Sequence, residues 1–305
     1  MDYIEEFEQL YCDCENTAIS YITTIKQYLG WCQDTRGWNI EDVVELADKR
    51  SSIQFLNHLL NDKELSPYSV NQKHTAMTTF FRYLCELDYR VLNPFENIRR
   101  ANTKMIERKA EYITYEEYEQ LINAINRKTN GVKHFDFVSA RDTLMITTMF
   151  TCGLRISEVL NMRYKDIDMK TKTIKIIGKG SKLRRVPVTS TMERALDIYE
   201  KVRGYHTESD LVFISIYGNQ MDRKDTNKNI AKYCKRASID KDITNHSLRH
   251  SCISYLLSQN VPIVYVKELA GHANLASTSI YSHAQDEDIW EYVEQAHNVG
   301  YSGMV

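Results

Sequence analysis

The sequence has only four prolines among its 305 residues and no apolar run long enough to cross a membrane. Its longest strongly apolar stretch, residues 144–154, is far short of the ~20 residues that a transmembrane helix needs. The acidic residues 1–10 lack the basic and apolar regions of a secretory signal peptide. With 43% hydrophobic and 26% charged residues, the chain is typical of a globular protein and is long enough for two domains. We therefore expect a soluble cytoplasmic protein with no membrane contact.

The chain also lacks a disulfide framework and a zinc-ligand pattern. Its seven cysteines are odd in number and spread from Cys12 to Cys252. Cys12 and Cys14 have no second pair of ligands at the spacing of a zinc site. We expect reduced thiols, as in cytoplasmic proteins, and no bound metal.

The chain has no large excess of positive or negative charge, since its net charge is −2. The acidic and basic residues are nevertheless segregated along the sequence. Residues 1–50 carry eleven acidic and four basic side chains, and residues 285–305 carry five acidic and no basic ones. Residues 163–185 carry nine basic and two acidic side chains, 98–110 carry five and one, and 222–236 carry six and two. A single basic run is usually a solvated face, but three such runs favour a surface that binds nucleic acid phosphates.

The first hundred residues show helical periodicity. One apolar stripe consists of Ile19, Ile22, Ile25 and Leu29. A second stripe, which follows a Ser-Pro helix start at 66–67, consists of Val70, His74, Met77, Phe81 and Leu84. The pattern ends at Asn93-Pro94, where the chain becomes basic and poorly periodic, as in a linker.

The rest of the chain is predicted to be mostly helical with one small sheet. Thr114 and Glu117 form a capping-box pattern, which predicts a new helix after the linker. Residues 171–177 alternate between polar and apolar side chains, as in a strand, and residues 183–189 read as a second strand. The Gly-Lys-Gly-Ser-Lys turn between them predicts a hairpin. The tail predicts an amphipathic helix, with an apolar stripe of Ile289, Tyr292, Val293 and Ala296.

Four short motifs carry candidate chemistry, and each has an ordinary structural explanation. Arg155, three residues before Glu158, could simply pair with it, and Lys179 could be a solvated turn residue. His246, Arg249 and His250 share one helix face, where the histidines could be structural or metal ligands, although no matching Cys, Asp or Glu lies nearby. His272 could cap a helix, and Tyr281, one of 20 tyrosines, could belong to the core.

In order and spacing, these motifs resemble those of the tyrosine recombinase, or phage integrase, family, and especially Xer-like recombinases. The resemblance covers the Gly-Leu-Arg-x-Ser-Glu run at 153–158, the Gly-Lys-Gly turn at Lys179 and the His-x-Leu-Arg-His run at 246–250. It also covers the Gly-His pair at 271–272 and the tyrosine nine residues later, with Ala270 in place of the usual leucine.

The resemblance implies a mainly helical (α+β) fold with four parts. These are a helical, SAM-like core-binding domain at 1–100, a basic linker at 101–110, a catalytic domain with a small antiparallel sheet at 111–285, and a helix for subunit exchange at 286–305. The two domains are expected to form a clamp around DNA. The tail could instead pack on its own subunit.

The residue types suit phosphoryl transfer without a metal ion. Arg155 and Arg249 are expected to hold the non-bridging phosphate oxygens as forks, with Glu158 and His250 in support. Lys179 would protonate the leaving sugar oxygen. His246 and His272 would donate hydrogen bonds or accept the tyrosyl proton. Tyr281 would be the nucleophile of a 3′-phosphotyrosine intermediate. No cofactor is expected, because the carboxylate cluster of a two-magnesium site is not evident.

We therefore expect a site-specific recombinase that acts through a Holliday junction, in integration and excision, inversion or dimer resolution. Its expected partner is double-stranded DNA with an inverted-repeat core site, bound by a homotetramer on two duplexes in a bacterial nucleoid, with accessory DNA-bending or directionality proteins. The alternatives are a type IB topoisomerase or telomere-resolvase-like enzyme, and a catalytically silent DNA-binding regulator. The residues expected to bind the DNA backbone are Arg99, Arg100, Lys104, Lys182, Arg184 and Arg185.

Overall fold

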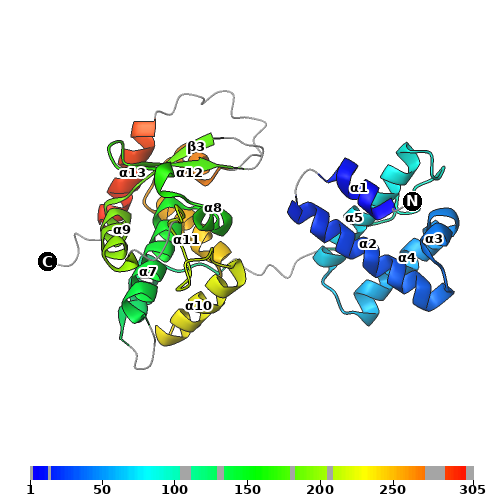
Figure 1. Cartoon of the computed structure of the whole chain (residues 1–305), viewed down its shortest axis with the longest axis horizontal. Helices are drawn as coiled ribbons and strands as arrows, with labels where there is room; N and C mark the ends of the chain where they lie inside the picture. The colour runs from blue at the N-terminus through cyan, green and yellow to red at the C-terminus, as the bar shows by residue number, and fades with distance from the viewer. Residues whose placement is uncertain are drawn as a thin grey trace. The chain divides into compact units, whose positions relative to one another are not determined.

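The computed structural model describes residues 3–12, 15–103, 111–128, 134–178, 183–204, 209–271 and 286–299. The chain divides into two compact units, Met1–Glu107 and Arg108–Val305 (Figure 1). Both units are mainly helical, and the second also holds a small antiparallel sheet, which confirms the predicted fold class. The expected clamp concerns the placement of the two units relative to each other and stays a prediction.

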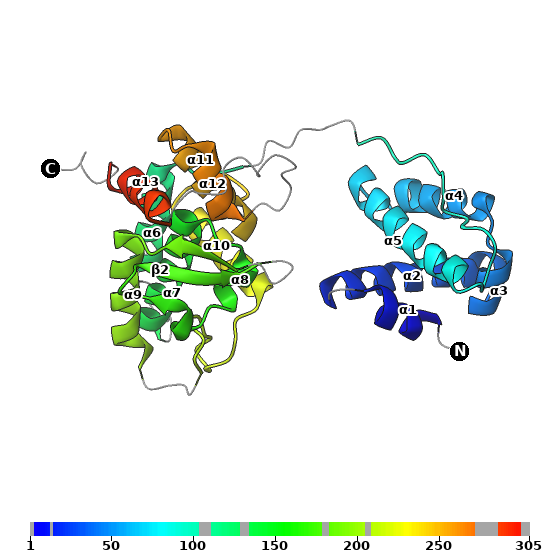
Figure 2. The same ribbon diagram turned by 90° about the horizontal axis from the view of Figure 1, so that it is seen from above.

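Unit 1 is a bundle of helices in which α2 and α5 lie side by side (Figure 2). Its helices begin at polar caps, among them Asp48 before α4 and Ser66, which accepts a hydrogen bond from the backbone of Ser69, before α5. Its elements are α1 (Tyr3–Tyr11), α2 (Glu15–Arg36), α3 (Ile40–Leu46), α4 (Lys49–Asn57), the π-helix η1 (His58–Asp62) and α5 (Pro67–Glu86).

Aromatic rings fill the core of unit 1. The ring of Tyr28 lies 4.9 Å from that of Phe55 and 5.3 Å from that of Phe95, centroid to centroid. The stripe predicted on α5 is buried throughout, and its His74 bonds the Phe95 carbonyl through Nε2 at 2.9 Å. The stripe predicted on α2 is only partly right, because Ile19 is 56% exposed.

Unit 2 is built around α7, which runs between α9 and α11 (Figure 1). The predicted capping box is confirmed, since Thr114 and Glu117 bond each other's backbone nitrogens at 2.8 and 3.2 Å. Its elements up to the sheet are α6 (Tyr115–Asn126), α7 (Phe135–Cys152), α8 (Ile156–Leu160), the 3-10 helix η2 (Tyr164–Asp166), β1 (Ile167–Asp168), β2 (Thr173–Ile177) and β3 (Leu183–Pro187).

The sheet has the order β1-β2-β3, and all of its pairs are antiparallel. The predicted hairpin is confirmed, with Ile174 opposite Val186 and Ile176 opposite Arg184. The short β1 was not predicted from the sequence. The elements after the sheet are α9 (Ser190–Arg203), α10 (Arg223–Arg236), α11 (Asn245–Ser258), α12 (Ile263–Ala270) and α13 (Asp286–Val299).

The predicted amphipathic tail is α13, and its apolar stripe packs on its own unit. Val293 and Ala296 are buried, and the Tyr255 hydroxyl of α11 donates a 2.7 Å hydrogen bond to the Ala296 carbonyl. Tyr292 stacks on Tyr265 of α12 at 5.1 Å. The apolar stripe of α13 therefore packs against helices of the same copy of the chain, which is the alternative in which the tail packs on its own subunit. Exchange of α13 between subunits stays a prediction.

In the part of the chain that the structure describes, no helix combines the length and the apolarity that a membrane crossing requires.

Candidate active site

Arg155 stands at the start of α8, directly after the end of the long buried helix α7. Gly153 ends α7 in the left-handed conformation, with φ at +61°, which favours glycine. A Cβ atom at this position would lie 3.2 Å from the Sγ atom of Cys252 on α11. The tight turn at Gly153 thus brings the start of α8 close to α11, which carries the second arginine of the sequence motifs, Arg249.

Glu158 holds Arg155 in place through a hydrogen-bonded ion pair. Its carboxylate accepts the backbone nitrogen of Arg155 at 2.8 Å and the Nη1 atom of Arg155 at 3.0 Å. The ion pair predicted as an alternative to catalysis is therefore present. The Arg155 side chain is nevertheless 42% exposed, whereas that of Glu158 is only 7% exposed. Arg155 can therefore reach an incoming anion while Glu158 stays beneath it.

Arg184 of β3 is the second partner of Glu158. Its Nη1 and Nη2 atoms donate to the two carboxylate oxygens at 2.9 and 2.8 Å, a bidentate arrangement. Burial by itself would raise the pKa of the Glu158 carboxyl, but hydrogen bonds from Arg184 and Arg155 outweigh it and hold this pKa below its usual value. Glu158 is therefore a carboxylate at neutral pH.

Arg249 is buried on α11, with 4% of its surface exposed. It donates to the carbonyl of Gly153 at 2.6 Å through Nη1 and to the carbonyl of Ala270 through Nη2. Burial, followed by the positive charge of Arg155, lowers the pKa of the Arg249 guanidinium to about 10. The side chain still carries its charge at neutral pH.

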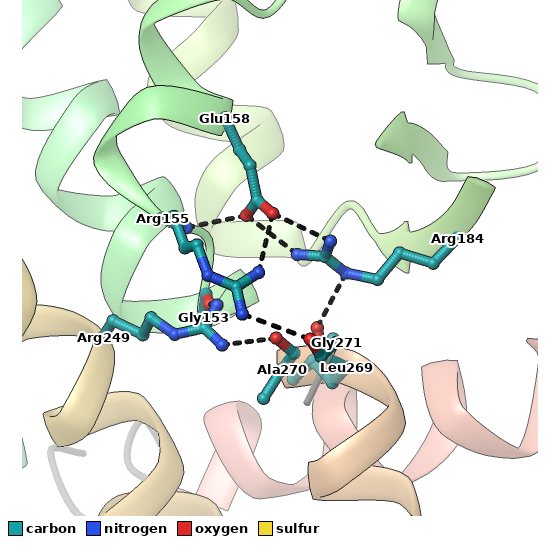
Figure 3. Close-up of polar contacts among 8 residues, drawn as sticks. All are labelled: Gly153, Arg155, Glu158, Arg184, Arg249, Leu269, Ala270 and Gly271. Carbon is teal, nitrogen blue, oxygen red and sulfur yellow. Dashed lines mark hydrogen bonds and ion pairs between the residues drawn. The ribbon is translucent and has the colours of Figure 1, made fainter. Parts of the chain in front are cut away.

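Three arginines converge on the last carbonyls of α12 (Figure 3). Arg184 donates through Nε to Leu269 at 3.1 Å, Arg249 donates to Ala270, and Arg155 donates through Nη2 to Gly271 at 3.1 Å. A helix end exposes unsatisfied carbonyls and partial negative charge, so cationic donors stabilise it. The structure thus joins α8, β3, α11 and the end of α12 at one point, with three positive charges around a single carboxylate.

His246 lies one helical turn before His250 on α11. Their Nε2 atoms are 2.9 Å apart, so one ring donates to the other. Burial lowers the pKa of His246, and the nearby charges of His250, Arg249, Arg223 and Arg155 lower it further. The neutral form of His246 is therefore favoured.

Several predicted site residues lie outside the described residues. They are Lys104, Lys179, Lys182, His272 and Tyr281. Two of them adjoin described parts of the site in the sequence, since Lys179 falls between β2 and β3 and His272 directly follows Gly271. The structure therefore brings together Arg155, Glu158, Arg249 and the end of the helix before His272.

The residues expected to bind DNA differ in their surroundings. Arg99, Arg100 and Arg185 are exposed, and Arg100 reaches the Thr75 hydroxyl at 3.3 Å. Arg184 instead points into the site, where Glu158 and Leu269 take its donors. Sequence reasoning missed this internal role. Strand alternation held the signal, because Arg184 shares a strand face with the buried Val186.

Within the described ranges, no group of three or more histidine, cysteine, aspartate or glutamate side chains is placed to hold a metal ion. His246 and His250 are hydrogen-bonded to each other through their Nε2 atoms.

Comparison with protein families gives two matches along the chain. Residues 111–288 match the phage integrase family, and residues 7–90 match the N-terminal SAM-like domain of phage integrases. A tyrosine recombinase of Pseudothermotoga lettingae is 30% identical over 300 residues, which cover 96% of this chain and 95% of that protein. The tyrosine recombinase XerC of Oceanobacillus iheyensis is 28% identical over 305 residues, covering 97% and 95% of the two chains.

Solved structures share the fold. The XerH site-specific recombinase bound to its difH substrate aligns with a TM-score of 0.65 and 22% identity over 90% of this chain and 78% of that chain. The Tn1549 transposon integrase in complex with circular intermediate DNA aligns with a TM-score of 0.69 and 18% identity over 94% and 95%.

Proposed function

The chain belongs to the phage integrase family, and from this premise we propose that Tyr281 cleaves DNA within a phosphate cradle built on Arg155 and Arg249. The enzyme is a tyrosine-type, site-specific DNA recombinase, which cleaves and rejoins DNA strands through a 3′-phosphotyrosine and a Holliday junction. No observation favours a topoisomerase, a telomere resolvase or a catalytically silent regulator over this function.

The main support for a phosphate-binding site at Arg155 and Arg249 is that their guanidinium groups lie close together at the end of α12. Arg155 and Arg249 come from different helices, yet they donate to neighbouring carbonyls, those of Gly271 and Ala270. Fixed guanidinium groups suit the non-bridging oxygens of a phosphate, whose negative charge grows as the nucleophile approaches. The 42% exposure of the Arg155 side chain leaves it accessible to a DNA strand.

The proposed reaction balances without an external cofactor. The phenolic oxygen of Tyr281 attacks phosphorus, the bond to the 5′ oxygen breaks, and the phosphate stays on the tyrosine. Lys179 supplies the proton that the leaving 5′ oxygen takes up, and His272 or His246 accepts the proton of the phenol. Because the phosphotyrosine keeps the bond energy, a 5′ hydroxyl of another strand reverses the reaction without ATP.

DNA is the proposed substrate and partner, in the form of a duplex with an inverted-repeat core site. The related XerH and Tn1549 proteins were solved with DNA bound, which supports this proposal. We further propose that four copies assemble on two duplexes, with accessory DNA-bending or directionality proteins, and that α13 docks on a neighbouring copy in this assembly. In one copy of the chain α13 packs on its own unit, so docking of its apolar stripe on a neighbour requires α13 to leave that surface.

Junction sequencing tests this function in cells. Expression of the protein beside a library of paired candidate sites should yield recombined junctions at one reproducible core sequence, with every base conserved. Tyr281→Phe should yield none, while the purified variant binds that sequence within a few-fold of wild type. Junctions that gain or lose bases, or that still form with the Phe variant, would contradict the proposal.

A further inference from the structure

We propose that Arg184 is a positioning residue of the recombinase, which aligns Arg155 and the end of α12 for the cleavage step. This inference rests on the proposed function of Arg155. It gives Arg184 a role inside the protein in place of the DNA contact expected from the sequence.

The first support is the way in which Arg184 meets Glu158. Two parallel hydrogen bonds of 2.9 and 2.8 Å join its guanidinium fork to the two carboxylate oxygens. The side chains of Arg184 and Glu158 are 12% and 7% exposed. A lysine at this position would keep the charge but could not form both bonds with fixed geometry.

The second support is that Glu158 is shared. The oxygen that accepts Nη1 of Arg184 also accepts Nη1 of Arg155, at 3.0 Å. Removal of one partner from a buried carboxylate leaves part of its charge uncompensated, which is strongly destabilising, so the remaining contacts of Glu158 are expected to change. The placement of Arg155 therefore depends on Arg184, although the two arginines belong to different elements, α8 and β3.

The third support is the packing of Arg184 against the end of α12. Its Nε atom donates to the Leu269 carbonyl at 3.1 Å. The guanidinium lies so close to Gly271 that a Cβ there would be 3.0 Å from Nη1 and 3.1 Å from Cζ and Nε. Gly271 also has a φ of +61°, so both the space and the backbone favour glycine.

These contacts tie Arg184 on β3 to α8 and to the end of α12, two elements that carry or adjoin residues of the proposed chemistry. It lies on the strand that follows the segment with Lys179, it shares a carboxylate with Arg155, and it fixes the helix end before His272 (Figure 3). A small displacement where these elements meet misaligns several reacting groups together, and misplacements of about 1 Å cost catalysis on the order of 100-fold.

The test compares Arg184→Lys and Arg184→Met with wild type in single-turnover formation of the covalent adduct, at saturating DNA that carries the site found by junction sequencing. We expect both variants to lose at least ~10-fold in rate, because the fork and not the charge is needed. Lys241→Met is the matched control. It breaks a 2.6 Å ion pair with Glu117 elsewhere in unit 2 and should leave the rate unchanged.

A methylphosphonate substrate separates positioning from loss of stability. It lacks the negative charge that Arg155 is proposed to bind, so variants that act through Arg155 should lose much less of their rate on it than on a phosphate. A variant that is merely less stable would lose the same fraction of its rate on the methylphosphonate and on the phosphate substrate.

Glu158→Gln should show the same pattern as the Arg184 variants, and the double variant Glu158→Gln/Arg184→Met should be no slower than the slower single variant. If Arg184→Met fails to fold, Arg184→Lys and Glu158→Gln carry the same comparison.

Salt dependence of DNA affinity tests the competing role of Arg184 as a phosphate contact. Removal of such a contact would flatten the log–log slope by about 0.9, and lysine would restore it. We expect no change in slope for either variant. A wild-type rate for Arg184→Lys, equal losses on both substrates, or a flattened slope that lysine restores would each overturn the inference. Failure of wild type itself to form an adduct would instead refute the proposed function.

Discussion

Arg155 and Arg249 donate hydrogen bonds to two consecutive carbonyls at the end of one helix, those of Gly271 and Ala270. The first arginine comes from the start of α8 and the second from α11. Both are therefore tied to the last turn of α12, from which the chain continues to His272. The orientation of the two arginines and the position of this helix end are set together.

Replacement of either arginine should harm cleavage far more than binding. Arg155→Ala and Arg249→Ala should each slow adduct formation by at least ~100-fold, because the charge that they stabilise peaks in the transition state. Arg249→Ala should also lower the melting temperature, since it leaves the buried carbonyls of Gly153 and Ala270 without a donor, at about 1–3 kcal/mol each. Single-turnover kinetics and thermal melts measure the two effects. An Arg155 variant that cleaves at the wild-type rate would rule it out of the cradle.

Lys179→Ala should be rescued by a better leaving group. If Lys179 protonates the departing 5′ oxygen, the variant should be slow on ordinary DNA and should recover much of its rate on DNA with a 5′-thiol leaving group, which needs no acid. The ratio of the two single-turnover rates is the measurement. Equal losses on both substrates would mean that Lys179 acts in some other way.

DNA affinity should fall steeply with salt, with a log–log slope of about −0.9 for each phosphate neutralised. The variant Arg99→Gln/Arg100→Gln/Lys104→Gln should flatten this slope, because Arg99 and Arg100 are exposed and all three belong to the basic stretch at residues 98–110. Titrations at several salt concentrations give the slope. An unchanged slope would show that this stretch does not contact DNA.

The stability of unit 2 should depend on His297 between pH 7 and pH 4. This residue of α13 is buried beside Phe150 and Tyr255, and burial lowers its pKa from 6.5 to about 4. Above pH 6.5 the ring is neutral in both the folded and unfolded chain. Below it the unfolded chain binds a proton that the folded chain resists, so stability falls with pH, by roughly 3 kcal/mol at pH 4.

Urea unfolding of wild type and His297→Leu at pH 7 and pH 4.5 measures this contribution. The variant should lose less stability than wild type between these two values. An equal loss in both proteins would mean that His297 is protonated as easily in the folded chain as in the unfolded one.

Local signals in the sequence predicted much of the fold. The capping box at Thr114, the hairpin strands and the helical stripe on α5 depend on neighbouring residues alone, and the structure bears them out. The prediction of the buried face of α2 was partly wrong because it considered only aliphatic residues, among them the exposed Ile19. The buried face of α2 instead presents Tyr28 and Cys32 to an aromatic core, which only the other helices define.

The site was predictable as a set of residue types but not as an arrangement. Motif order pointed to Arg155 and Arg249, whereas the partner of Arg184, Leu269, lies 85 positions away in the sequence and no local pattern identifies it. Charge counting placed Arg184 with the DNA-facing residues, although strand alternation with the buried Val186 indicated that it faces inward. The packing partner of α13 was also undetermined, since an amphipathic helix does not identify the surface that covers it.

Mapping of the covalent adduct tests the central claim most directly. Wild-type protein should be trapped on a nicked duplex that carries the core site, digested, and analysed by tandem mass spectrometry for the peptide that holds the nucleotide. The proposed function predicts one modified residue, Tyr281, joined to a 3′-phosphate, and no adduct with Tyr281→Phe. Attachment at any other of the 20 tyrosines, or linkage to a 5′-phosphate, would contradict it.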